Sequence, residues 1–128
     1  LERLRALLPP AGASPSNPVD LGLGAAFAPR LYLESLEICL EDPEVDTVLM
    51  VGGGRTPEAA EAFTQGLVSI RKKTSKHILA FMYPGASYFS PEHIATLLSS
   101  GIPVYSTPER GLRAYSRMLE YYRFRAEE

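Results

Sequence analysis

Apolar residues recur every three or four positions in several stretches of the chain, which is the spacing of one helical face. The clearest stripe is Ala59, Phe63, Leu67 and Ile70. The basic run Arg71–Lys73 follows it, at the end of a helix where the dipole favours cations. The same spacing predicts three further helices. Their stripes are Leu33, Leu36 and Leu40; Ile94, Leu97 and Leu98; and Leu112, Tyr115, Leu119 and Tyr122.

Short runs rich in β-branched and aromatic residues separate these helices. The runs are Thr47–Val51, His77–Tyr83 and Pro103–Ser106, and a hydroxyl–Pro–Glu triplet follows each of them directly or after a short loop. In each triplet the hydroxyl residue caps a helix, proline fits the first helical position, and glutamate favours the positive end of the dipole. The triplets are Thr56-Pro57-Glu58, Ser90-Pro91-Glu92 and Thr107-Pro108-Glu109.

Strand and helix therefore alternate, which is typical of βαβ units and a parallel sheet. With Val19–Gly22 as a first strand, the pattern predicts a three-layer α/β domain. Its sheet is open and mostly parallel, with about four strands and helices on both faces. Ligands of such sheets lie beyond the carboxyl ends of the strands. We expect the loops 22–27, 52–56, 83–90 and 106–107 to converge there.

Length and composition bound the class of protein. The chain has 128 residues and a net charge of −2, which suits one domain and leaves no basic field for nucleic acid or an anionic membrane. We predict a helix end and linker over 1–16 and a single domain over 17–128. Because the chain starts inside a helix pattern without Met, we expect it to be excised from a longer polypeptide, and removal of a tag is the alternative. The single cysteine, Cys39, fits a buried thiol in a reducing cytoplasm.

The strongest functional candidate is the segment where Thr47–Val51 ends in Gly52, Gly53 and Gly54, followed by Arg55 and Thr56. Glycines let the backbone approach a ligand closely, and a helix N-terminus just beyond them attracts anions. One hypothesis is therefore a phosphate or carboxylate site built from these five residues. The alternative is a tight turn that needs small residues for packing. The segment matches neither a P-loop nor the Gly-x-Gly-x-x-Gly motif.

A second group of residues is a candidate for the wall of the same crevice. Asn17 and Asp20 lie at the predicted first strand, while Gly85 and Ser87 follow the third. An ordinary strand-to-helix connection is the alternative for the later pair, and Asp20 can instead cap a turn.

Candidate catalytic residues are not evident from the sequence. His77 opens a strand and His93 lies in a first helical turn, and neither has a cysteine or second histidine at metal-ligand spacing. Ser87 and Cys39 have no assigned base, so a free-standing enzyme is the least favoured interpretation. We predict no catalytic residue and no metal site in this chain.

A family resemblance appears once the segments are read in order. They are Ser16–Leu21, a helix with Tyr32 and Leu36, Asp42–Asp46 before the apolar strand, Gly101–Tyr105, and Thr107–Arg110. Together they resemble the flavodoxin-like CoA-ligase domain of the NDP-forming acyl-CoA synthetases, relatives of succinyl-CoA synthetase. The similarity runs from about Asn17 to Tyr122, nearly the whole chain.

The resemblance implies one domain of a multidomain acid–thiol ligase. Such enzymes interconvert an acyl-CoA, phosphate and ADP (or GDP) with an acid, CoA and ATP (or GTP) through a phosphohistidine. It implies partner domains that bind CoA, carry the histidine and form an ATP-grasp site. Here Gly52–Thr56 would help to stabilise the phosphoryl group, and the isolated domain would be inactive and bind no cofactor alone. His77 stands where the family has proline, so it does not inherit the catalytic role.

The sequence leaves two alternatives open. One is a regulatory or scaffold module on the same frame without an anion site. The other concerns assembly, since removal of neighbouring domains could expose a surface that forms a homodimer. The acyl substrate and the choice of adenine or guanine nucleotide are set outside this segment.

Overall fold

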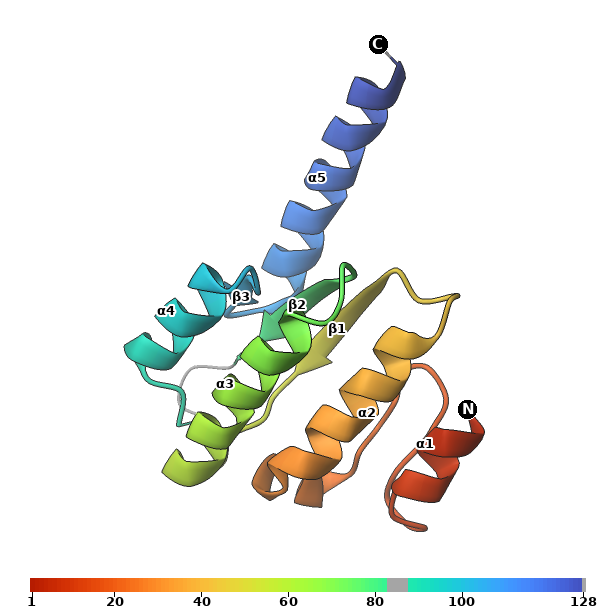
Figure 1. The fold of residues 1–128 in the computed structure, drawn as a ribbon, viewed down its shortest axis with the longest axis vertical. Coiled ribbons are helices and arrows are strands. Elements are labelled where there is room, and N and C mark those ends of the chain that lie inside the picture. Colours follow the sequence, from red (N-terminus) through yellow and green to blue (C-terminus); the bar gives the residue numbers. More distant parts are fainter. Residues whose placement is uncertain (83–87, 128) are drawn as a thin grey trace.

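The computed structural model describes residues 1–82 and 88–127. From α2 onward, helices and strands alternate along the chain, as Figure 1 shows. In order they are α1 (Glu2–Leu7), the 3₁₀ helix η1 (Leu23–Phe27), α2 (Pro29–Glu41), β1 (Thr47–Val51), α3 (Pro57–Arg71), β2 (His77–Phe81), α4 (Pro91–Ser99), β3 (Val104–Tyr105) and α5 (Pro108–Glu127). No helix within these two ranges is both long and apolar enough to cross a membrane.

The strands form one parallel sheet in the order β1-β2-β3. Thr47 pairs with His77 and Val51 with Phe81, so β1 and β2 align along their whole length. β3 contributes only two residues, and Ala80 pairs with Val104. Three of the predicted strands, at 47–51, 77–83 and 103–106, are confirmed, although β2 ends at Phe81 and β3 has only two residues.

The three hydroxyl–Pro–Glu triplets begin helices as predicted. Thr56 Oγ1 accepts the Ala59 amide at 3.1 Å, and Ser90 Oγ accepts the His93 amide at 3.3 Å. Thr107 Oγ1 is 3.5 Å from the Arg110 amide nitrogen, the longest of the three. The caps satisfy helix-end amides that would otherwise lack an acceptor.

One face of the sheet carries the main core. Helices α2, α3 and α4 cover it side by side (Figure 1). Phe63 and Leu67 of α3 and Leu97 of α4 are fully buried there against Ile78 of β2. The stripes predicted for α2 and α3 are therefore confirmed as packing faces.

On the opposite face α5 packs against β2 and β3. Its Gly111 is buried so closely against Phe81 and Tyr105 that an added Cβ would lie 2.8 Å from the Tyr105 ring. Side chains alternate between the two faces of a strand. Ala80 and Met82 point toward α2, α3 and α4, so Phe81 and the helix α5 that contacts it lie on the opposite face. The α/β fold with an open parallel sheet and helices on both faces is thereby confirmed.

The predicted first strand is wrong. Val19–Gly22 does not join the sheet, so the described part of the chain has three strands instead of about four. Asp20 instead makes an isolated antiparallel bridge with Ser14, and its carboxylate accepts the Gly22 amide at 2.8 Å. The positive φ of Gly22, 76°, then turns the backbone away from an extended path.

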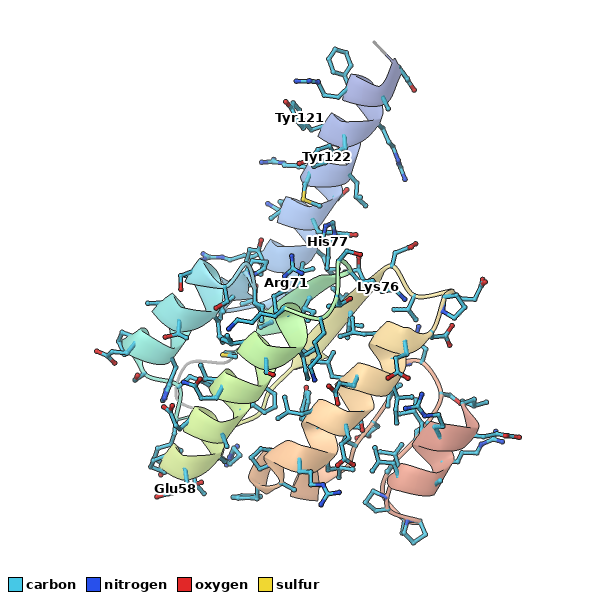
Figure 2. The ribbon with its side chains drawn as sticks, viewed as in Figure 1. Glu58, Arg71, Lys76, His77, Tyr121 and Tyr122 are labelled. Atoms are coloured by element: carbon cyan, nitrogen blue, oxygen red, sulfur yellow. The ribbon has the colours of Figure 1, made fainter. Side chains whose placement is uncertain are left out.

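The predicted stripe of α5 forms a helix but not a packing face. Leu112 is 46% exposed and Tyr122 is 61% exposed. The second half of α5 extends past the sheet, away from the other elements (Figure 1). Figure 2 shows Tyr121 and Tyr122 on this projecting part.

Candidate anion site at the glycine turn

The glycine turn, Gly52–Thr56, connects β1 to α3 at the carboxyl end of the sheet. Gly52, Gly53 and Gly54 have φ values of 82°, 110° and 62°. Side chains with a Cβ rarely adopt such angles, so consecutive glycines are needed for this path. The path of the turn therefore depends on glycine at all three positions.

Two of these glycines also have a packing role. Gly53 and Gly54 are buried. A Cβ on Gly53 would lie 2.9 Å from the Phe63 ring, and one on Gly54 would lie 2.8 Å from Phe89. The backbone of the turn thus packs directly on aromatic rings, as the alternative interpretation expected for part of this segment.

Some amides of the turn are already engaged within the protein. The Gly52 amide donates to the Phe81 carbonyl at 3.0 Å, and the Arg55 amide donates to the Ala26 carbonyl at 3.0 Å. Among residues 1–82 and 88–127, the amides of Gly53, Gly54 and Thr56 make no hydrogen bond. Two of the five predicted residues, Gly52 and Arg55, therefore have amides that donate within the protein.

Charge at the turn comes from Arg55 and from the start of α3. The Arg55 side chain is exposed and forms no ion pair within the described residues. The first turn of α3 carries the positive end of the helix dipole, opposed by Glu58. Figure 2 shows Glu58 at this end of α3 and Arg71 at the other end.

Neighbouring loops meet at the glycine turn. Besides the bond from Arg55 to Ala26 of η1, the Tyr88 amide donates to the Gly54 carbonyl at 2.9 Å. Tyr32 of α2 donates its hydroxyl to the Val51 carbonyl at 2.6 Å, and burial raises the pKa of this phenol to about 12. Residues from three predicted crevice loops therefore come together.

The other predicted crevice residues contribute less. Asn17 and Asp20 are exposed, and the Asp20 carboxylate is engaged in the local turn with Gly22. Gly85 and Ser87 lie outside the described residues. The structure thus places neither Asn17 nor Asp20 in a hydrogen bond with the glycine turn.

One polar pair near the turn is not predicted by the sequence reasoning. His93 Nδ1 accepts the Ser90 amide at 3.1 Å, and its Nε2 lies 2.9 Å from Glu61 Oε2. With Nδ1 as an acceptor, the ring proton resides on Nε2 and is donated to Glu61, whose pKa this bond lowers. The pair connects α3 to α4 close to Phe89. The signal was the position of His93 three residues after the Ser90 cap, where Glu or Gln usually completes a capping box.

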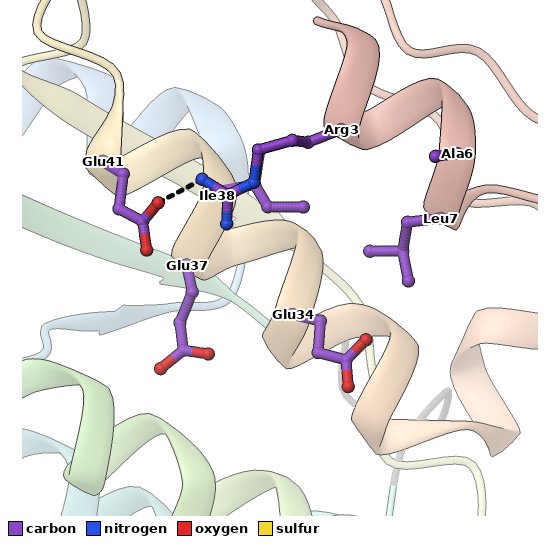
Figure 3. A pocket seen from close by; sticks show the side chains of 7 residues that line it. All are labelled: Arg3, Ala6, Leu7, Glu34, Glu37, Ile38 and Glu41. Atoms are coloured by element: carbon purple, nitrogen blue, oxygen red, sulfur yellow. Dashed lines mark hydrogen bonds and ion pairs between the residues drawn. The ribbon is translucent and has the colours of Figure 1, made fainter.

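Two surface hollows of about 450 Å³ each lie elsewhere. One lies between α1 and α2, where Glu34, Glu37 and Glu41 line one side and Arg3 pairs with Glu41 (Figure 3). The other lies along α5. Neither includes a residue of the glycine turn, and open hollows on exposed helix surfaces are a weaker indication of a site than convergent loops.

Comparison with known proteins adds an independent finding. No protein-family model matches the chain. Over all 128 residues it is 38% identical to part of a protein from Archaeoglobus fulgidus described as acetate–CoA ligase [ADP-forming] I. The chain spans 17% of the length of that relative.

Proposed function

From this kinship with one segment of an ADP-forming acetate–CoA ligase, which confirms the resemblance predicted from the sequence, we propose that the chain is a domain of an NDP-forming acyl-CoA synthetase. The match along the entire chain is the observation that carries this proposal. The complete synthetase, the parent of this domain, would join an acid to CoA at the expense of a nucleoside triphosphate. The proposal places the phosphorylated histidine in another domain of the parent, so the isolated domain is expected to be inactive.

The role proposed for the glycine turn is to stabilise a phosphoryl group presented by a neighbouring domain. The exposed Arg55 guanidinium and the N-terminus of α3 supply positive charge in one place. Because the Gly52 and Arg55 amides are engaged, the contribution is mainly electrostatic. A helix end of this kind contributes about 0.3–1 kcal/mol to a nearby anion.

The proposed partners are the other domains of the synthetase: those that bind CoA, carry the phosphohistidine and bind the nucleotide. CoA and ADP or ATP (or the guanine nucleotides) are then substrates of the parent and not cofactors of this domain. A cytoplasmic location is part of the same proposal. The relative's greater length supports a multidomain parent.

A phosphate titration of the isolated chain, followed by amide NMR shifts, tests the anion site. We expect saturable shifts at Gly53, Gly54 and Thr56 that need a several-fold higher phosphate concentration in Arg55→Ala. Lys72→Ala, at the opposite end of α3, is the matched control and should titrate like the unmodified chain. Unchanged amides at the glycine turn at millimolar phosphate would count against the site.

A regulatory or scaffold module without an anion site is the second candidate. The burial of Gly53 and Gly54 against Phe63 and Phe89 favours it, since packing alone then requires these glycines. This candidate predicts that phosphate shifts no amide signal of the glycine turn. It also predicts that the domain still contributes to assembly of the complete synthetase. The same titration therefore separates the two candidates.

A further inference from the structure

One side of α5 carries a row of arginines, which we call the arginine row. Arg110, Arg113 and Arg117 follow one another at intervals of three and four residues, so their side chains project from the same side of the helix. All three are exposed. None of them forms an ion pair with a carboxylate of residues 1–82 and 88–127. The row therefore presents three positive charges that the described part of the chain does not neutralise.

The arginine row surrounds a hollow with a small residue in its lining. The hollow has a volume of about 450 Å³, and Thr107, Glu109 and Ala114 line it together with the three arginines. Because Ala114 is exposed and has only a methyl group, side chains of another segment can lie over it between the guanidinium groups. Glu109 lies in the first turn of α5, where hydrogen bonds from its own amide and from Thr107 lower its pKa. The lining thus has an excess of positive charge.

The same side of α5 becomes aromatic on the projecting half of the helix. Tyr121 and Phe124 follow Arg117 at intervals of four and three residues, and they are 54% and 60% exposed. Gly111 and Tyr115, which contact the sheet, lie on a different side of the helix. We call the combined surface the arginine–aromatic face. It consists of Arg110, Arg113, Ala114, Arg117, Tyr121 and Phe124.

The projecting half of α5 has little tertiary support. α5 packs against β2 and β3, but its second half extends past the sheet (Figure 1). Helices shorter than about 12–15 residues are marginal in water without tertiary packing, and half of this 20-residue helix falls below that length. A second helix lying along the arginine–aromatic face would supply the missing contacts.

From these observations we infer that the arginine–aromatic face binds an acidic amphipathic helix from another part of the synthetase, outside residues 1–128. Arginine binds carboxylates through two parallel hydrogen bonds, and Arg and Tyr are enriched at the centres of interfaces. Carboxylates of the partner helix oppose the arginine row, and its apolar side chains cover Tyr121 and Phe124. This inference rests on the proposed function, because the rest of the synthetase supplies the partner. The relative's greater length supports such a partner.

A second copy of this chain fits the arginine row less well. The chain has an acidic row of the same spacing on α2, formed by Glu34, Glu37 and Glu41. These carboxylates already form ion pairs with Arg30, Lys73 and Arg3, respectively. The acidic row is therefore neutralised within its own chain and offers little charge to the arginines of another copy.

Zero-length cross-linking of the complete synthetase tests the inference. A carbodiimide joins a lysine amine to a carboxylate that contacts it, and Arg117→Lys places an amine within the arginine row. We expect this variant to yield a peptide linked to Asp or Glu of a helix outside residues 1–128. Arg123→Lys, exposed on the other side of α5, is the matched control and should yield no such link.

Two results of this experiment would overturn the inference. One is the absence of any link from Arg117→Lys to a residue outside the chain. The other is a link to Glu34, Glu37 or Glu41 of a second copy, because the partner would then be this chain itself.

Filling the hollow adds a second readout. In the Arg117→Lys enzyme, Ala114→Leu should lower the yield of the link by about tenfold or more, since the larger side chain occupies the space of the partner. Because position 114 is exposed and leucine favours helix, the isolated chain should stay folded. Ser116→Leu, exposed on the other side of α5, is the matched control and should keep the link. An undiminished link in Ala114→Leu would contradict the inference.

These outcomes are independent of phosphate binding at the glycine turn. A phosphate-responsive protein without the link would refute this inference alone. A linked enzyme whose glycine turn does not respond to phosphate would refute the anion site alone.

Discussion

Helices α3 and α5 begin with the same three residues, Thr-Pro-Glu, yet they are integrated very differently. In α3 the stripe Ala59, Phe63, Leu67 and Ile70 is buried. In α5 only Gly111 is buried, while most of the stripe stays partly or largely exposed. Local signals decide where a helix starts, but the surface opposite decides whether its apolar face is used. For α3 that surface is present along its length, whereas the second half of α5 extends past the sheet (Figure 1).

The largest expected difference between the helices lies in their stripes. Phe63→Ala should lower the free energy of unfolding by about 3–5 kcal/mol, because it removes a fully buried ring. Tyr122→Ala on α5 should change it by less than about 0.5 kcal/mol. Urea unfolding of both variants measures the difference. Similar losses would show that α5 is packed more firmly than the structure indicates.

The next test concerns the one close contact of α5. Gly111→Ala should cost about 1–3 kcal/mol, because the new Cβ would overlap the rings of Phe81 and Tyr105. Gly66→Ala on α3 should cost less, since its Cβ meets only the flexible end of Leu33. Thermal unfolding checks the order. A stabilised Gly111→Ala protein would mean that helix propensity outweighs this contact.

The caps should differ in the same direction. Thr56→Ala removes a bond of 3.1 Å and should cost about 1 kcal/mol. Thr107→Ala removes one of 3.5 Å on a helix with few tertiary contacts, and we expect less than about 0.5 kcal/mol. Circular dichroism of the urea transition compares them. Equal costs would remove the distinction between the two helix starts.

The smallest effect involves the bond that ties α3 to α4. The pKa of Glu61 is lowered from 4.5, first by the hydrogen bond from His93. A carboxylate with a depressed folded-state pKa adds stability above its unfolded pKa, and this is lost as pH falls through the folded value. Stability of the unmodified chain should therefore decline below about pH 4.5 more steeply than that of Glu61→Gln. Melting temperatures between pH 3 and 6 measure this, and parallel curves would exclude the pair as a contributor.

Helix starts and packing stripes could be predicted from the sequence, whereas one predicted strand was wrong. The triplets and stripes located α3, α4 and α5 because capping and periodicity are local properties. Val19–Gly22 was misassigned because a short apolar run does not reveal that Asp20 will bind the Gly22 amide and pair with Ser14. The side-chain hydrogen bond of Asp20 stabilises a turn at this position instead of a sheet strand.

The candidate site was predictable only in part. The three glycines marked the turn, but the rings of Phe63 and Phe89 that bury Gly53 and Gly54 come from α3 and from the segment before α4. The Ala26 carbonyl that takes the Arg55 amide comes from η1. Such distant contacts determine how many donors remain for a ligand, and no local pattern encodes them.

The central claim is that the glycine turn supports a phosphoryl group carried by the parent synthetase. The most direct measurement is the amount of phosphohistidine formed when the complete enzyme is incubated with labelled ATP. Arg55→Ala should lower it several-fold, as expected for about 1 kcal/mol of lost stabilisation, while Lys72→Ala leaves it unchanged. An Arg55→Ala enzyme with the full amount of phosphohistidine would contradict the account.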